Sequence, residues 1–333
     1  MSTQHFLYIS TILFILVSAS CYTKPEARIA GGQVSGTNQF PYTVELINTL
    51  SNGQSVCGGS LINRRYILTA AHCYLENPNI SAANVIVGTN DLNANDAQVI
   101  RISHAIVHPG YNNETYENDI AIAVLSRDVP ESSTTQYMVL STTAPSANTN
   151  LWVAGWGITS DNAQNIPLLQ NYAELYAVDG SRCRNAFNIF SEQDSLCLYG
   201  VNQQPCSGDS GSAAVLQTLS NGRFVGVGVV SYGRDSCTRR QDSLNVFTSI
   251  PAYYNFIALN ANLNNVPTGT GFRVLQGALP VNSTNPPQES DSVIGINAST
   301  QPPTIDNNND ERSSSTILIP SIALIVFAAV MAL

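Results

Sequence analysis

The nine residues from Cys206 to Ala214 read Cys-Ser-Gly-Asp-Ser-Gly-Ser-Ala-Ala. Within them, Ser210 stands between Gly208 and Gly211 and directly follows Asp209. A serine in a glycine-rich turn is typical of an activated nucleophile, because glycine lets the backbone bend sharply and bring its N–H groups close to a bound carbonyl. Serine and glycine are also common in surface turns, so this stretch alone leaves both interpretations open.

A nucleophilic serine needs a base that takes its proton, and the histidines are the first candidates. The chain has four. His5 precedes an N-terminal apolar core and would be lost with the signal peptide predicted below, and His104 and His108 are expected to be surface or turn residues. His72 ends the run Leu-Thr-Ala-Ala-His and precedes a cysteine. It is the candidate base, and a buried structural histidine is the alternative.

The candidate acid that orients this base is Asp119, which opens the apolar run Ile120–Leu125. A carboxylate at such a position is costly to bury unless a hydrogen-bonding partner compensates for the lost water. A strand that begins facing the solvent is the alternative interpretation of Asp119.

Composition excludes one class of function. The 333 residues can hold one large or two ordinary domains, and a hydrophobic content of 44% is enough for a substantial core. Charged residues make up only 11%, the net charge is −9, and Lys24 is the single lysine. Nucleic-acid binding needs clustered Lys and Arg, so we expect no nucleic-acid partner.

The N-terminal residues predict secretion. Residues 6–19 form an apolar core followed by small residues, so residues 1–20 are predicted to be a secretory signal peptide; an uncleaved membrane anchor is the alternative. A secreted or surface-tethered protein can form disulfides and carry N-linked glycans. Four Asn-x-Ser/Thr sites are predicted to be glycosylated: Asn79, Asn113, Asn282 and Asn297.

The C-terminal residues predict a membrane anchor. Residues 316–333 are apolar, with no Lys or Arg after them. They fit a GPI-anchor signal that is removed, and a single transmembrane segment is the alternative. Residues 264–315 are rich in Pro, Thr, Ser and Asn and read as an extended stalk, although residues 272–281 are apolar enough to pack back on the domain.

Residues 29–263 predict an all-β domain. Many short runs rich in Val, Ile, Leu, Tyr and Thr are broken by Gly, Asn and Pro, which is typical of a sandwich or barrel. A helix is predicted over residues 252–263, with Tyr254, Ile257 and Ala258 on one face. The predicted strands include residues 42–47, 60–69, 84–87, 99–107, 120–125, 151–154 and 224–230.

The chain has seven cysteines, and Cys21 lies at the signal junction. The remaining six allow fifteen pairings, so counting does not decide the connectivity. Their spacing resembles no zinc site, and we expect neither a metal nor a cofactor. The six are Cys57, Cys73, Cys183, Cys197, Cys206 and Cys237.

Together these motifs resemble the chymotrypsin/trypsin-like serine endopeptidases, whose catalytic residues follow the order His, Asp, Ser. The resemblance covers roughly residues 29–263 and implies two six-stranded antiparallel β-barrels with the active site between them. The matching motifs are Ile29–Gly32, Cys57–Ile62, Thr69–Cys73, Asn118–Ala121, Gly155–Gly157, Gly208–Gly211 and Ser231–Gly233.

The resemblance implies a role for each catalytic residue. Ser210 attacks the peptide carbonyl, His72 shuttles the proton, and Asp119 orients the imidazole. The backbone N–H groups of Gly208 and Ser210 form the oxyanion hole. The implied disulfides are Cys57–Cys73, Cys183–Cys197 and Cys206–Cys237.

The resemblance also implies a zymogen. Residues 21–28 would be a propeptide that an activating trypsin-like protease removes by cutting between Arg28 and Ile29. The new amine of Ile29 would pair with Asp209 and order the oxyanion hole.

Four residues are implied in substrate binding: Gln204 at the floor of the primary pocket, and Ser231, Gly233 and Asn245 around it. Gln204 and Asn245 are neutral, where a protease for Lys or Arg would carry an aspartate at the floor. We therefore expect chymotrypsin-, elastase- or collagenolytic-like specificity. Asp235 and Asp242 lie nearby in sequence and could restore some preference for basic side chains.

The sequence thus predicts an active endopeptidase with protein or peptide substrates and with protein protease inhibitors as further partners. The alternative from another class is a catalytically silent homologue that acts as a surface binding module. Such homologues commonly lose a triad residue, and here all three are present. A lipase or esterase is disfavoured, because its serine would come first in the chain.

Overall fold

The computed structural model describes residues 29–50, 53–74, 83–163, 165–217, 222–233, 237 and 243–263. The predicted signal peptide, propeptide, stalk and C-terminal tail lie outside the described residues. So do Arg28, Asp235, Asp242 and three of the four predicted glycosylation sites, Asn79, Asn282 and Asn297. Within the described ranges, no helix is both long and apolar enough to cross a membrane.

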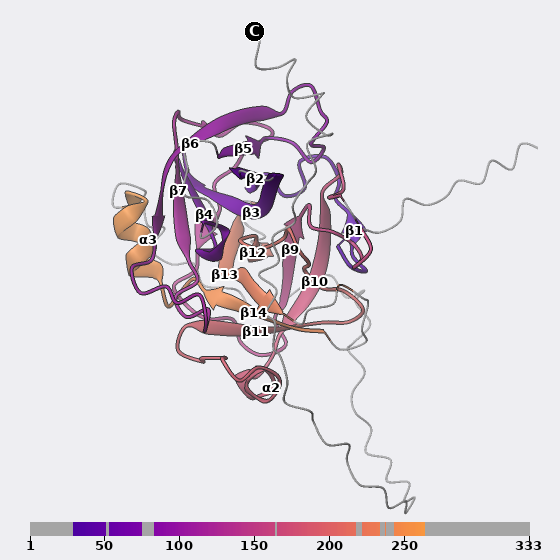
Figure 1. Ribbon diagram of the computed structural model, residues 1–333, viewed down its shortest axis with the longest axis vertical. Coiled ribbons are helices and arrows are strands. Elements are labelled where there is room, and N and C mark those ends of the chain that lie inside the picture. Colours follow the sequence, from indigo (N-terminus) through magenta and orange to yellow (C-terminus); the bar gives the residue numbers. More distant parts are fainter. Residues whose placement is uncertain are drawn as a thin grey trace, which may run out of the picture.

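The first half of the domain is a closed antiparallel barrel, drawn in indigo and purple in Figure 1. Its strand order is β2-β3-β4-β7-β6-β5, and β5 closes the ring on β2. Val44, Leu46 and Ile122 are among the buried aliphatic side chains of its core. The strands are β2 (Thr43–Leu50), β3 (Gly53–Asn63), β4 (Tyr66–Thr69), β5 (Asn84–Val87), β6 (Gln98–Val107) and β7 (Ala121–Leu125).

The second half is also a closed six-stranded antiparallel ring, in the order β10-β11-β14-β13-β12-β9 with β9 paired back to β10. Two short strands extend it: β1 (Gln33–Val34) on β10, and β8 (Val139–Leu140) parallel to β13. Its strands are β9 (Asn150–Gly155), β10 (Asn171–Ala177), β11 (Ser195–Gly200), β12 (Ala213–Gln217), β13 (Phe224–Gly233) and β14 (Ser243–Ser249). The predicted pair of six-stranded barrels is confirmed.

One predicted strand proved wrong in detail. The run over residues 60–69 is not one strand but the two arms of a hairpin, because β3 ends at Asn63 and β4 begins at Tyr66. Arg64 and Arg65 form the turn, and both make ion pairs with Asp128. The three polar residues Asn63, Arg64 and Arg65 interrupt the apolar run at the point where the chain reverses.

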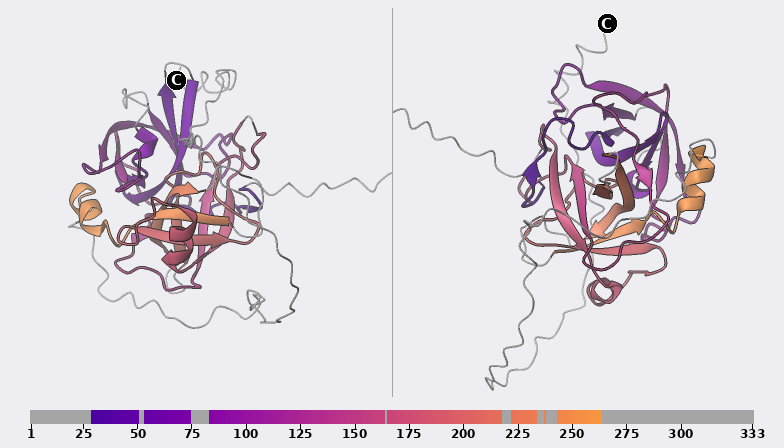
Figure 2. Two further views of the ribbon diagram at one scale, coloured as in Figure 1. Left: turned by 60° about the horizontal axis from the view of Figure 1, so that its bottom comes forward. Right: turned by 180° about the vertical axis from the view of Figure 1, so that it is seen from behind.

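The C-terminal helix is shorter than predicted, and it buries a different face from the one predicted. Helix α3 (Tyr254–Asn260) packs its cap residue Tyr253, Ile257 and Ala261 against the core of the first barrel. The predicted face shared only Ile257 with the observed one. Both Figure 1 and the rear view in Figure 2 show α3 lying against the first barrel. The last helix of the domain thus packs against the barrel formed by its N-terminal half.

A second helix, α2 (Gly180–Ala186), was not predicted. Asp179 caps it by accepting a hydrogen bond from the Ser181 N–H at 2.9 Å. Such a cap stabilises a short helix by about 1 kcal/mol. The disulfide between Cys183 of α2 and Cys197 of β11 attaches the helix to the second barrel.

The structure joins six cysteines in the three pairs that the family resemblance implies. Cys57–Cys73 connects β3 to the turn after β4, with Cα atoms 6.3 Å apart. Cys206–Cys237 connects the loop before β12 to the segment after β13, with Cα atoms 5.6 Å apart. In the chain-entropy description, loops of these sizes each add about 3 kcal/mol of stability.

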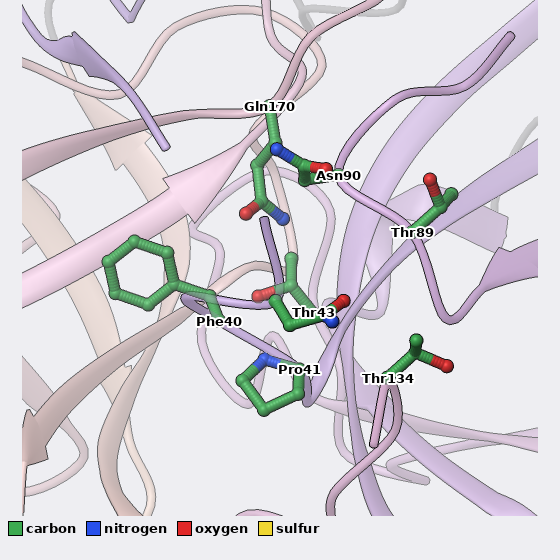
Figure 3. Close-up of a pocket in the computed structure, with 8 residues that line it drawn as sticks. Phe40, Pro41, Thr43, Thr89, Asn90, Thr134 and Gln170 are labelled. Atoms are coloured by element: carbon green, nitrogen blue, oxygen red, sulfur yellow. The ribbon is translucent and has the colours of Figure 1, made fainter. Parts of the chain in front are cut away.

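A small cavity lies away from these loops, between the start of β2 and the segment before β10. Figure 3 shows Thr43 and Gln170 facing each other across it, beside Phe40 and Pro41. The hydroxyl of Thr43 and the amide nitrogen of Gln170 are buried and have no partner among the described residues. A buried water molecule is the usual occupant of such a polar space. No predicted catalytic residue lines it.

Candidate active site

His72 and Asp119 meet because two paired strands place them together. His72 begins the 3-10 turn η1 (His72–Tyr74) just after β4, and Asp119 lies just before β7. Strands β4 and β7 are antiparallel, with Thr69 opposite Ala121, so the end of one lies beside the start of the other. Asp119 accepts two hydrogen bonds from His72, at 2.9 Å from the backbone N–H and at 2.8 Å from Nδ1.

The second barrel holds the same aspartate from the other side. The hydroxyl of Ser231, in β13, donates to Asp119 Oδ2 at 2.6 Å, and the hydroxyl of Thr248, in β14, donates to the Asp119 carbonyl at 2.8 Å. Family resemblance placed Ser231 in substrate binding and did not assign this bond. Nothing in the sequence signals it, because the two residues are 112 positions apart.

These contacts set the protonation of the pair. Burial by itself raises the pKa of Asp119, but the charge and hydrogen bonds of His72 and the hydrogen bond of Ser231 outweigh it and hold that pKa below its usual value. Burial lowers the pKa of His72, but the charge and hydrogen bond of Asp119 raise it above the ordinary 6.5. Nδ1 faces the carboxylate, so Nε2 is the nitrogen left to accept a proton.

Ser210 lies in the loop between β11 and β12, and its backbone packs on the first barrel beside Cys73. Its carbonyl accepts a hydrogen bond from the Gly58 N–H of β3 at 2.8 Å, and it lies 3.8 Å from the sulfur of Cys73, the neighbour of His72. Gly211 has a φ of +86°, and a Cβ there would lie 3.1 Å from the Ala70 nitrogen and closer still to Gly58. Glycine at 211 therefore lets the loop of the second barrel sit directly on the first.

The loop before Ser210 has a backbone conformation that favours glycine. Gly208 has a φ of +98°, which favours glycine. Within the described residues, the N–H groups of Gly208 and Ser210 donate to no other protein atom. Two backbone N–H groups in one short loop that have no acceptor among the described residues are suited to binding a carbonyl oxygen that gains negative charge.

Asp209 points into the protein. Its carboxylate is fully buried and accepts hydrogen bonds at 2.9 Å from the Gly157 N–H and at 2.9 Å from the Cys206 N–H. Burial outweighs these bonds and raises the pKa of Asp209 to about 7. A Cβ on Gly155 or Gly157 would run into this carboxylate, so both glycines make room for it.

Ile29, the first described residue, is buried in the core of the second barrel. Leu151, Val153 and Phe247 belong to the same apolar cluster. The next residue, Ala30, accepts a hydrogen bond from the Gln204 N–H at 3.1 Å. The chain that follows the predicted cleavage bond is therefore inserted in the domain.

Two of the four predicted pocket residues are cross-strand neighbours. Gly233 of β13 lies opposite Asn245 of β14, and a Cβ on Gly233 would lie 2.8 Å from the Asn245 side-chain oxygen. The Asn245 amide donates to the Ser243 carbonyl at 3.3 Å. Gln204 and Asn245 are each 5% exposed, so both neutral amides are buried.

Comparison with known proteins now decides the family. The trypsin family model matches residues 29–257, which is most of the chain and the whole of both barrels. The chain belongs to the trypsin family. It is a serine endopeptidase, with protein substrates as its class of ligand, and its three disulfides are consistent with an extracellular protein.

Individual relatives match over 73% to 98% of their own length. This trypsin-family chain is 34% identical over 228 residues to "Trypsin alpha-4" of Lucilia cuprina, covering 68% of this chain and 86% of that protein. It is 29% identical over 257 residues to "Trypsin" of Xenopus laevis, covering 76% and 98%. It is 32% identical over 267 residues to "CLIP domain-containing serine protease B4" of Anopheles gambiae, covering 73% of each chain.

Sequence reasoning missed a row of aromatic rings that begins at the histidine. The His72 ring lies 5.8 Å from that of Tyr116, which lies 5.4 Å from Tyr232, which in turn lies 5.6 Å from Phe187. These rings come from a loop, from β13 and from the segment after α2, so no local pattern links them. In this trypsin-family domain they form an apolar wall beside the histidine.

His104 and His108, the other two histidines that the structure describes, form none of the hydrogen bonds given above for His72, Asp119 and Ser210. His104 is exposed on β6, as expected, and His108 packs its ring 4.8 Å from that of Phe256 in α3. In the described part of the chain, Cys57, His72 and Cys73 are the one cluster with metal-ligand types close together. Its two sulfurs form a disulfide and so offer no thiolate to a metal.

Proposed function

We propose that this trypsin-family endopeptidase is catalytically active and uses His72, Asp119 and Ser210 as its triad. The observation that carries the proposal is the bonding of Asp119, which His72 approaches from one barrel and Ser231 from the other. A buried carboxylate with these partners keeps its charge and fixes the imidazole with Nε2 free for proton transfer. The alternative, a silent binding homologue, is not favoured, because it has no need of this arrangement.

The proposed reaction passes through an acyl-enzyme. The Ser210 oxygen attacks the peptide carbonyl carbon while its proton moves to His72 Nε2. The resulting oxyanion is held by the N–H groups of Gly208 and Ser210, and one such donor stabilises the transition state by about 3–4 kcal/mol. The C–N bond then breaks as His72 gives its proton to the leaving amine. Water, deprotonated by His72, releases the acid in the same way.

Activation by proteolysis is the second part of the proposal. An activating trypsin-like protease would cut after Arg28, remove the propeptide of residues 21–28 and create a charged amine on Ile29. The buried position of Ile29 and the raised pKa of Asp209, about 7, support this. An ammonium group in that interior would keep Asp209 ionised and hold the Gly208–Ser210 loop in position.

For specificity, we propose a preference for uncharged side chains, of the chymotrypsin, elastase or collagenolytic type. Two observations support this. The buried amides of Gln204 and Asn245 are neutral. The Asn245 side chain lies close to the backbone of Gly233. The aromatic row at Tyr116 and Tyr232 would add apolar contacts for neighbouring substrate residues. Cleavage of a peptide library tests it, and a sharp preference for Arg or Lys would contradict it.

Outside the catalytic domain of residues 29–263, we propose a signal peptide over residues 1–20, a stalk over 264–315 and an anchor signal over 316–333. The protein would then stand on the outer cell surface, with protein protease inhibitors as further partners. Asn113, which is exposed, is a suitable glycan acceptor. Release from cells by a phospholipase that cuts GPI anchors tests this arrangement, since a transmembrane segment would resist the enzyme.

The decisive test of catalysis is covalent labelling of the cleaved protein by a fluorophosphonate. We expect one label per chain on Ser210 and none on the variant Ser210→Ala, because only an activated serine displaces fluoride from this reagent. Failure of the correctly cleaved protein to react would favour the silent binding module.

A further inference from the structure

Glu45 is a buried acid that the reaction described above does not use. It lies in β2, and its side chain has no exposed surface. Neither carboxyl oxygen has a hydrogen-bond partner among the described residues. Burial disfavours the ionised form and raises the pKa of Glu45 well above its usual value.

This acid lies against the back of the loop that carries Ser210. Across the β2–β3 pair Glu45 is opposite Gly58, and a Cβ on Gly58 would lie 3.0 Å from the Cβ of Ser212 and closer still to its hydroxyl. The missing side chain of Gly58 thus lets Ser212 fit beside Glu45. The Ser212 hydroxyl is itself buried and has no partner among the described residues.

Asp209 shares this interior. The space that a Cβ on Gly155 would fill is bounded by the Ser212 hydroxyl, at 3.1 Å, and by a carboxylate oxygen of Asp209. The field of Asp209 reaches Glu45 and raises its pKa further. Asp209 receives two backbone N–H bonds, whereas Glu45 receives none. The negative charge therefore belongs on Asp209 and the proton on Glu45.

We propose that Glu45 is a positioning residue for the catalytic loop. Its neutral carboxyl fills the space behind Asp209 and Ser212, and its ionisation would displace Asp209 together with the Gly208–Ser210 backbone attached to it. The inference rests on the proposed role of that backbone as the oxyanion hole. It predicts that stability falls with rising pH over the range in which folded Glu45 keeps a proton that the unfolded chain has lost. It also predicts that activity falls at higher pH, as Glu45 ionises in the folded enzyme.

Few other charged groups lie near the Glu45 carboxyl. The residues opposite Glu45 are Gly58 on β3 and Ile86 on β5, and neither titrates. Gly155 and Gly157 bring no charge from the second barrel. In the part of the chain that the structure describes, Asp209 is the charged group that acts on Glu45, and the proposed Ile29 amine would join Asp209.

The variant Glu45→Gln tests whether the Glu45 carboxyl is protonated in the folded protein, because glutamine has nearly the same shape and does not titrate. In a Ser210→Ala background, which prevents self-digestion, urea unfolding is measured from pH 5 to pH 10. Between the unfolded and folded pKa values of Glu45 the native state holds one more proton than the unfolded state, so wild-type stability falls as pH rises. The unfolding constant of the wild type should increase relative to Glu45→Gln by up to about tenfold per pH unit. This measurement needs no activity, so it stands apart from the test of catalysis.

The positioning role is tested by the pH profile of kcat/KM for the cleaved enzyme with Ser210 intact. Glu45→Gln should keep its activity to higher pH than the wild type. The control Glu114→Gln makes the same change on an exposed side chain and should follow the wild type. A stability difference that is independent of pH overturns the proposal, and so does an alkaline limit that Glu45→Gln leaves unmoved.

A measurement on the unsubstituted Glu45 covers the case in which Glu45→Gln does not fold. In Ser210→Ala protein with ¹³C-labelled glutamate carboxyls, one glutamate resonance should remain at its protonated position at pH 7. Ionisation of every glutamate at that pH would overturn the proposal.

Discussion

At the scale of single residues, the number of hydrogen-bond donors that each buried acid receives decides how its pKa is shifted. Asp119 receives hydrogen bonds from His72 and Ser231, and its carboxylate is stabilised although it is fully buried. Asp209 receives two backbone N–H groups and has a pKa of about 7. Glu45 receives none from the described residues, and burial raises its pKa well above its usual value. Three buried acids in one domain thus reach three protonation behaviours through their surroundings alone.

The raised pKa of His72 has a consequence for activity. The base must be neutral to accept the Ser210 proton, so kcat/KM should rise with pH through the pKa of His72 in the free enzyme. Because Asp119 stabilises the charged imidazole, we expect the midpoint of this acid limb above the ordinary value of 6.5. Steady-state hydrolysis of a peptide substrate from pH 4 to pH 8 measures it. A midpoint below 6.5 would mean that burial outweighs Asp119.

At the scale of elements, strand pairing does most of the positioning. The pairing of β4 with β7 brings together His72 and Asp119, which lie just beyond the paired ends. The pairing of β13 with β14 brings Gly233 opposite Asn245. Helix α3 belongs to the end of the domain, yet it packs on the first barrel, where the Asn63 amide also donates to the Ala261 carbonyl at 3.3 Å.

Helix α3 offers a matched pair of substitutions. Ile257 is completely buried, whereas Leu259, two positions further on, is 74% exposed. Ile257→Ala should lower the free energy of unfolding by about 2–4 kcal/mol, because it leaves a cavity between helix and barrel. Leu259→Ala should change it by less than about 0.5 kcal/mol. Urea unfolding of both in the Ser210→Ala background checks this, and equal effects would show that α3 does not pack as described.

At the scale of the whole molecule, the site exists only where two barrels meet. The first supplies His72 and Asp119, and the second supplies Ser210, Ser231 and Thr248. The hydrogen bonds from Ser231 and Thr248 to Asp119 cross the boundary between them. Any change that separates the barrels therefore weakens the orientation of the base as well as the position of the nucleophile.

Activation is a property of the whole chain, because the proposed switch joins its first folded residue to the nucleophile loop. The precursor variant Arg28→Gln should resist cleavage by a trypsin-like protease and should remain at least about 100-fold less reactive to a fluorophosphonate than the cleaved wild type. The expected reason is that Asp209 lacks its ammonium partner and the oxyanion donors are not held in place. Treatment of both precursors with the same protease measures it. Full activity of uncleaved Arg28→Gln would contradict the zymogen mechanism.

Much of this protein follows from its sequence. Short apolar runs separated by Gly, Asn and Pro predict the strands, because alternation and turn residues are local properties. The motifs around His72, Asp119 and Ser210 indicate the family, and from the family follow the two barrels and the disulfide pairs. The bounds of β5, Asn84–Val87, agree with the predicted run to the residue.

Only the tertiary structure decided what depends on residues far apart in the chain. The Ser231 hydrogen bond to Asp119, the inward face of α3 and the aromatic row at Tyr116 each join segments that share no local pattern. Glu45 is the clearest case, because an acid in an apolar strand reads as a solvent-facing position. Its burial becomes apparent only when the second barrel covers that side of β2, since burial is set by what packs against a strand and not by the strand itself.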